Sequence, residues 1–259
     1  MQNIRLIGVV HVLPLPGTPL ENCSFEEVLD RAIYDANELK AGGCDTVILE
    51  NFGDAPFLRG SVEAHCISMM TVIAFHVKNL GLKIGINILR NDATAAMAIA
   101  TAIGAEFIRV NVHTGAAWTD QGLIQGDAYK TLQYRRQLRS SVDIAADIMV
   151  KHARPAGDWT ILDAAKDAFF RGRAKYLIIT GSGTGAAVDW SEVEMIRTAL
   201  PTVPLWIGSG MTPEALSKAS KWINGAIVGT FFHENSDLDR PLTRHRVKEF
   251  VDAIVALSP

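Results

Sequence analysis

The chain has 259 residues, of which 48% are hydrophobic and 20% charged, and its formal net charge is -3. This charge excludes the strong basic excess that is typical of nucleic-acid and anionic-membrane binding. The three cysteines, Cys23, Cys44 and Cys66, form no C-x-x-C pair, and no apolar run is long enough to span a membrane. We therefore expect a cytoplasmic protein without a disulfide framework.

Short apolar runs alternate with helical segments along the whole chain. Eight runs have the length and the β-branched content expected of parallel strands that are buried on both faces. They are Leu6–Val10, Thr46–Leu49, Ile84–Leu89, Phe107–Val112, Ile148–Val150, Tyr176–Ile179, Leu205–Ile207 and Ala226–Val228. Eight alternating strands and helices predict one (β/α)₈ barrel, a TIM barrel, as a single domain over residues 1–259.

Helix-start signals follow several of these runs. The pairs Ser24 with Glu27 and Ser191 with Glu194 have the spacing of capping boxes. Asp92 can cap an alanine-rich helix, and Thr212-Pro213 has the pattern of an N-cap followed by the first helical residue. These signals place helices between the predicted strands, as the barrel requires.

One connection, from Thr114 to Asp147, is longer than the others. It contains a predicted helix, Tyr129–Leu138. Loops of this length in compact domains are commonly functional. A lid is one role that this connection could have.

A doubly wound sheet is the alternative fold. It requires a dinucleotide-binding fingerprint after the first strand, and residues 11–14 do not have that pattern. The glycine-rich segment Gly181–Gly185 lacks the G-x-G-x-x-G spacing. The barrel is therefore the preferred prediction.

Polar residues in the predicted strands fall on one face. In the fourth strand Arg109, Asn111 and His113 share one face, and apolar residues occupy the other. A charged side chain inside a barrel is costly unless it is paired or functional. Because barrel enzymes place their chemistry at the carboxyl ends of strands, we predict a catalytic site there. Its candidate residues are His11, Glu50, Asn87, Arg109, Asn111, His113 and Lys151.

These candidates allow more than one role. Glu50 is the preferred general base, Lys151 could polarise a carbonyl or form a Schiff base, and His11 or His113 could act as an acid. The alternative is a structural network in which Arg109 pairs with Glu50. A divalent metal on His11, Glu50 and His113 stays open, although no ligand spacing indicates one, and we predict no cofactor.

Glycines end the last two predicted strands. They belong to Gly208-Ser209-Gly210 and to Gly229-Thr230. In barrels, backbone amides at these positions commonly bind phosphate, and glycine permits close approach of the anion. We predict that a phosphate group binds between these loops, although the glycines alone would also suit tight turns.

Taken with these motifs, the chain resembles the BtpA/SgcQ family, which is assigned to the ribulose-phosphate-binding barrel superfamily. The matching segments are residues 8–11, 13–17, 50–57, 109–111, 115–116, 119–122, 150–153, 180–181, 184–185, 208–214 and 228–230. Mouth candidates that these segments contain are Asn51, Asp54, Thr180, Gly181 and Thr184. Asp189 follows the glycine-rich loop and is expected either to reach the mouth or to cap the next helix.

The resemblance implies a barrel with a phosphate site, but it does not identify catalytic residues. The family is named for a role in photosystem I biogenesis. We therefore hold two hypotheses. The first is an enzyme that acts on a small phosphorylated sugar or nucleotide-like metabolite by acid–base chemistry, as a lyase, isomerase or hydrolase. The second is a non-catalytic assembly or stability factor for a membrane complex, which would expose apolar partner surfaces. Neither involves nucleic acid, and a homo-oligomer is compatible with both.

Overall fold

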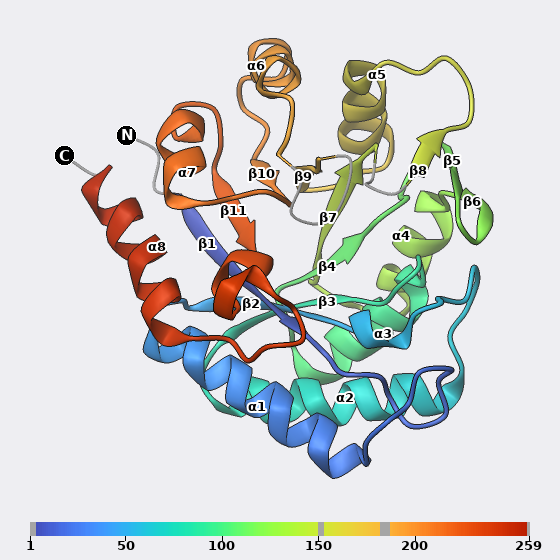
Figure 1. Cartoon of the computed structure of the whole chain (residues 1–259). Helices are drawn as coiled ribbons and strands as arrows, with labels where there is room; N and C mark the ends of the chain where they lie inside the picture. The colour runs from blue at the N-terminus through green and yellow to red at the C-terminus, as the bar shows by residue number, and fades with distance from the viewer. Residues whose placement is uncertain (1–3, 150–152, 182–186, 258–259) are drawn as a thin grey trace.

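The computed structural model describes residues 4–149, 153–181 and 187–257 (Figure 1). Its centre is a closed barrel of eight parallel strands in the order β1-β11-β10-β9-β7-β4-β3-β2. The barrel strands are β1 (Arg5–His11), β2 (Thr46–Glu50), β3 (Lys83–Asn87), β4 (Phe107–Val110), β7 (Asp143–Ile148), β9 (Tyr176–Ile179), β10 (Leu205–Ile207) and β11 (Gly225–Val228). The predicted TIM barrel is confirmed.

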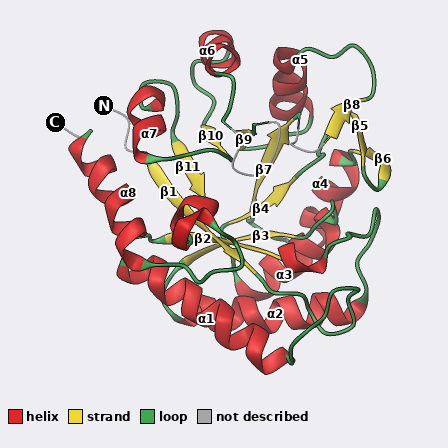
Figure 2. Ribbon diagram, viewed as in Figure 1, coloured by secondary structure: helices red, strands yellow, loops and turns green. Residues whose placement is uncertain are grey.

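Helices surround the barrel, as Figure 2 shows. They are α1 (Phe25–Ala41), α2 (Ala64–Asn79), α3 (Ala93–Ile103), α4 (Ala128–Gln137), α5 (Ile161–Lys166), α6 (Trp190–Ala199), α7 (Pro213–Ala219) and α8 (Arg244–Ala256). Short turns of helix are η1 (Phe52–Asp54), η2 (Asp167–Arg171), η3 (Thr230–Phe232) and η4 (Glu234–Ser236). Within the described residues no helix combines the length and the apolar character needed to cross a membrane.

Local sequence signals explain where several helices begin. The capping box of Ser24 and Glu27 forms at the start of α1, and the side chains of Asp92 and Thr212 cap α3 and α7. The predicted capping box at Ser191 is wrong. Asp189 is the N-cap of α6 and accepts a hydrogen bond from the Ser191 amide, because its carboxylate already occupies the capping position.

The predicted fifth strand is placed too late in the sequence. β7 occupies Asp143–Ile148, whereas the prediction began at Ile148 and assigned Asp147 to the preceding loop. Alanines and aspartates dilute the apolar signal of this strand, so its periodicity is weak. The third and fourth strands also end two residues earlier than expected, at Asn87 and Val110.

The long connection before β7 contains a hairpin as well as α4. Its strands β5 (Ala116–Thr119) and β6 (Gly122–Gln125) pair with each other, and β5 also pairs with β8 (Ala153–Pro155), which follows β7. The resulting three-stranded sheet joins two loops that flank the same barrel strand. It lies at one side of the barrel mouth (Figure 1).

The barrel interior is stratified from its amino to its carboxyl end. Arg5 lies near the floor, where its guanidinium is 5.7 Å from the Phe107 ring and 5.9 Å from the Trp206 ring. An aromatic layer comes next, in which Trp206 stacks on Tyr176 with ring centroids 4.1 Å apart and meets Phe107 edge-on at 5.2 Å. This apolar plug supports the polar residues above it.

Candidate functional site

A buried ion cluster centred on Arg109 of β4 fills the upper barrel. Arg109 Nη1 lies 2.8 Å from Glu50 Oε1, and Nε and Nη2 lie 2.9 and 3.0 Å from the two carboxylate oxygens of Asp147. All three side chains are at most 6% exposed. Burial alone would lower the pKa of Arg109, but the two carboxylates outweigh it and raise that pKa above its usual value.

Two amides extend the cluster toward β3. Asn111 Nδ2 donates to Asp147 Oδ2 over 3.0 Å, and Asn87 Nδ2 donates to Asn111 Oδ1 over 3.1 Å. Asn87, Arg109 and Asn111 are all buried. Their hydrogen bonds to one another and to Asp147 place all three side chains inside the barrel, as predicted, and strand alternation explains this for Asn87 and Arg109.

The ends of β1, β2 and β3 lie side by side. His11 pairs in register with Glu50, and Glu50 pairs with Asn87. The His11 ring meets Phe52 edge-on at 4.8 Å and lies 5.7 Å from the His233 ring. The predicted catalytic residues of these three strands are thus neighbours at one rim of the barrel.

Two pockets flank the pair of Glu50 and Arg109, and both side chains line both pockets. One pocket, of about 460 Å³, lies over β2, β3 and β4. The other, of about 150 Å³, lies over β1, β10 and β11. Together they form a mouth at the carboxyl ends of the strands, where barrel proteins bind small molecules.

The predicted phosphate loops line the smaller pocket. The lining includes Gly208, Ser209, Gly210, Gly229 and Thr230, together with His11. The Ser209 hydroxyl accepts a hydrogen bond from the Gly181 amide, which ties this loop to the loop after β9. Among the described residues, the amides of Ser209 and Gly210 donate to no backbone carbonyl.

Packing accounts for part of the glycine pattern. A Cβ at Gly208 would lie 2.7 Å from Ile178 Cγ2 and 3.4 Å from Arg109 Nη2, and one at Gly229 would lie 2.6 Å from His11 Cε1. Gly210 has a φ of 65°, which favours glycine. Each of these glycines therefore has a structural reason that is independent of an anion.

His113 does not reach the mouth. β4 ends at Val110, so strand alternation no longer directs His113 inward. Its Nε2 lies 2.8 Å from the Gly172 carbonyl oxygen, and it lines neither pocket of the mouth. The structure therefore does not bring His113 together with His11 and Glu50, as the predicted acid role and metal site would require. Within the described ranges no group of three or more potential metal ligands of the His, Cys, Asp and Glu types is present.

Other predicted mouth residues brace the loops. Asn51 Nδ2 donates to Asp54 Oδ2, Asn51 Oδ1 accepts from the Leu89 amide, and Asp54 Oδ1 accepts from the Leu15 amide. Burial raises the pKa of Asp54. Asn51 and Asp54 line a separate pocket beside Cys66, and the two-sided mouth does not include them.

The remaining candidates divide between the mouth wall and positions outside it. Thr180 is buried beside Gly208, and Gly181 contacts Ser209. Asp189 is the helix cap described above and lines neither pocket of the mouth. Lys151 and Thr184 lie outside the described residues.

Three charged residues of the site escaped the sequence prediction. Asp147 anchors Arg109, and Arg90 and Asp120 line the larger pocket. Burial lowers the pKa of the Arg90 guanidinium, while Asp147 and Asp120 oppose that effect. Asp120 lies in the two-residue turn between β5 and β6, so the hairpin of the long connection borders the mouth.

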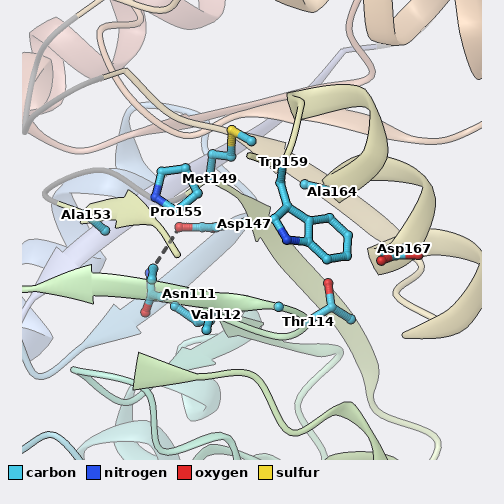
Figure 3. Close-up of a pocket in the computed structure, with 13 residues that line it drawn as sticks. Asn111, Val112, Thr114, Asp147, Met149, Ala153, Pro155, Trp159, Ala164 and Asp167 are labelled. Atoms are coloured by element: carbon cyan, nitrogen blue, oxygen red, sulfur yellow. Dashed lines mark hydrogen bonds between the residues drawn. The ribbon is translucent and has the colours of Figure 1, made fainter. Parts of the chain in front are cut away.

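Another pocket, of about 60 Å³ and outside the two-sided mouth, lies on the far side of Asp147, between β7, α5 and the three-stranded sheet (Figure 3). Trp159 and Met149 line this pocket, and so do Asn111 and Asp147, which are joined by a hydrogen bond (Figure 3). Its size leaves the two-sided mouth as the main candidate site.

Buried histidines predict lower stability in acid. Burial lowers the pKa of both His113 and His233, against the opposing effect of the carbonyls they contact. Because the unfolded chain then binds protons more readily than the folded protein, the free energy of unfolding falls as the pH drops below about 6.5. Urea unfolding at pH 7.5 and 5.5 should show a smaller fall for a His113→Gln variant than for the wild type. The exposed control His76→Gln should follow the wild type, and an equal fall in all three proteins would contradict the assignment.

The fold and the mouth define a TIM-barrel protein with a charged, two-sided site sized for a small molecule. The chain belongs to the BtpA family, whose model matches residues 2–256. It is 42% identical to the photosystem I biogenesis protein BtpA of a Synechocystis strain, over 96% of this chain and 87% of that protein. It is also 40% identical to an uncharacterised protein of Pyrococcus abyssi, over 97% and 96% of the two chains. A mitochondrial protein of Caenorhabditis elegans is 30% identical over 97% and 93%.

Solved structures with the same fold share little sequence identity with this chain. KGPDC from Streptococcus mutans matches with a TM-score of 0.60 at 10% identity, covering 100% of both chains. The native KDPGal structure matches with a TM-score of 0.57 at 16% identity, covering 99% of this chain and 98% of that one. At this identity the likeness shows the fold alone.

Proposed function

We propose that this protein is an enzyme that acts on a small phosphorylated sugar by acid–base chemistry at the carboxyl-end mouth of the barrel. The observation that carries the proposal is the sharing of Glu50 and Arg109 between the two pockets. A substrate whose phosphate occupies the smaller pocket would extend its carbon chain over Glu50 into the larger one.

The smaller pocket suits an anion. The amides of Ser209 and Gly210, which donate to no backbone carbonyl of the described residues, can supply donors together with the half-buried His11, and none of the described residues that line the pocket is a lysine. Arg109 lies beneath it but is held by two carboxylates, so most of the attraction must come from backbone amides. A structure of KGPDC, one of the barrels with the same fold, was solved in complex with D-R5P, which supports a sugar phosphate as ligand.

Glu50 is the group best placed for proton transfer. One carboxylate oxygen receives the hydrogen bond from Arg109, which orients the side chain, and the residue lines both pockets. A positioned carboxylate within reach of a sugar carbon or hydroxyl can accept and return a proton. Asp147 faces the other side of Arg109 and acts as a positioning residue for this arrangement.

The alternative, a non-catalytic biogenesis factor, is favoured by the name of the Synechocystis relative. Relatives that are 40% and 30% identical occur in an archaeon and a nematode, where a photosystem role does not apply. Thermal unfolding with a panel of phosphorylated metabolites separates the two functions. A ligand at one hundred times its Kd should add about 2.7 kcal/mol to the free energy of unfolding. No stabilisation by any metabolite would favour the assembly role.

Substitution of Gly210 by valine tests the phosphate site directly. We expect Gly210→Val to weaken binding of D-ribose 5-phosphate at least tenfold, measured by calorimetric titration, because the new side chain would fill the anion position. Gly81→Val is the matched control, since Gly81 also has a positive φ, 84°, and only the Lys40 amine within 4 Å of the added Cβ. If Gly210→Val folds and keeps full affinity, the phosphate does not bind between the β10 and β11 loops.

A further inference from the structure

Among the described residues, the side-chain amide of Asn87 forms hydrogen bonds through its nitrogen and not through its oxygen. Its Nδ2 donates to the Arg109 carbonyl oxygen and to Asn111 Oδ1, each over 3.1 Å. Its Oδ1 is buried and has no hydrogen-bond partner among the described residues, and the residue is 1% exposed. Buried acceptors in native proteins are nearly always paired, so an unpaired one calls for a physical explanation.

The buried ion cluster of Arg109, Glu50 and Asp147, called the charge cluster below, fixes the orientation of the Asn87 amide. A carboxylate only accepts hydrogen bonds, so Asn111 must turn its Nδ2 toward Asp147, as observed. The Oδ1 of Asn111 then faces Asn87, so Asn87 must donate a hydrogen bond to it from Nδ2. If the Asn87 amide were flipped, its Oδ1 would face the Arg109 carbonyl oxygen and Asn111 Oδ1, and two oxygen acceptors cannot form a hydrogen bond. The flip therefore gives Oδ1 no partner. The two partners of Nδ2 lie on β4 and its continuation, and Oδ1 is left on the side away from β4.

The described residues around the larger pocket carry no net positive charge, because Asp147 also pairs with Arg109. Asn87 lines the larger pocket of the mouth together with two guanidinium groups, Arg90 and Arg109, and two carboxylates, Glu50 and Asp120. A second anionic group on the ligand would disturb this balance. A neutral group that donates a hydrogen bond would supply what the buried acceptor lacks.

We infer that Asn87 Oδ1 accepts a hydrogen bond from a hydroxyl group of the substrate, and that the substrate is a sugar phosphate with one anionic end and a neutral, hydroxyl-bearing carbon chain. The phosphate lies toward the β10 and β11 loops, and the chain crosses Glu50 to reach Asn87. Asn87 is then a specificity-determining residue. This inference rests on the proposed function, because it takes the smaller pocket as the phosphate site.

Calorimetric titration with two probes tests the inference. Inorganic phosphate reports on the phosphate site alone, and D-ribose 5-phosphate reports on both pockets. Asn87→Ala should weaken D-ribose 5-phosphate about tenfold, the effect of one lost hydrogen bond, and change phosphate affinity less than twofold. Asn91→Ala is the matched control. The Asn91 amide also bridges to β4's continuation, through both backbone groups of Val112, but it does not line the pocket. It should leave both affinities unchanged.

A second measurement needs no variant. Single-deoxy analogues of D-ribose 5-phosphate are titrated into the wild type, and at least one should bind about tenfold more weakly than the parent sugar. If every analogue binds as tightly as the parent, or if Asn87→Ala weakens both probes equally, the inference is overturned while the phosphate site stands. If neither probe binds the wild type, the proposed function fails and this inference fails with it.

Discussion

Replacement of Arg109 by leucine should lower the free energy of unfolding by about 3–5 kcal/mol, measured by urea unfolding at pH 7. Arg109 contacts both Glu50 and Asp147 inside the barrel, and its removal leaves two buried carboxylates without a counter-charge. The desolvation of those carboxylates, and not the loss of attraction alone, makes the effect large.

Two comparisons separate this explanation from a simple loss of packing. Arg244→Leu removes an exposed arginine that pairs with Glu38 at 2.7 Å, and should have far less effect because solvent screens the pair. The triple variant Arg109→Leu with Glu50→Gln and Asp147→Asn removes all three charges and should recover part of the stability. A triple variant less stable than Arg109→Leu would contradict the account.

Replacement of Phe107 by alanine should also cost about 3–5 kcal/mol, because it opens a cavity in the aromatic layer that supports the charge cluster. Phe107 is fully buried and meets the Trp206 ring edge-on. Phe75→Ala is the control, since Phe75 is 54% exposed and its truncation leaves no cavity. Chemical unfolding of the two variants gives the comparison.

Gly85 on the neighbouring strand shows why the aromatic ring fits. A Cβ at Gly85 would lie 2.3 Å from Phe107 Cζ, so the glycine makes room for the ring. Gly85→Val should therefore be destabilising in the wild type and better tolerated together with Phe107→Ala. Additive effects of the two substitutions would show that they do not share the same space.

The barrel could be predicted from the sequence because strands that are buried on both faces appear as short apolar runs, and recognisable helix-start residues separate these runs. The same alternation identified Asn87 and Arg109, which lie on the inner faces of β3 and β4, and it also led to Asn111, the first residue after β4, whose side chain still points inward. His113 was misplaced because the strand ends before it, and alternation has no meaning beyond a strand end. Strand ends depend on tertiary contacts that local pattern does not contain.

Asp147 was missed for a related reason. Its strand contains two alanines and two aspartates, so the apolar run that marks other strands is absent. The small sheet of β5, β6 and β8 was also missed, because strands of three or four residues carry little periodic signal. Arg90 and Asp120 enter the mouth from loops, and only the folded arrangement brings them there.

Ring closure between the first and last strands has a consequence for synthesis on the ribosome. β1 pairs with β2 on one edge and with β11 on the other, and the partners of the second edge are separated by more than 200 positions, as in Arg5 with Gly225. The charge cluster needs only the chain up to Asp147, so its carboxylates can meet Arg109 while the nascent protein is still an open sheet. His11 meets Gly229 only after β11 has emerged. The cluster can therefore assemble well before the anion pocket, and a chain truncated before β11 would carry the charges of the site without a complete pocket for a ligand.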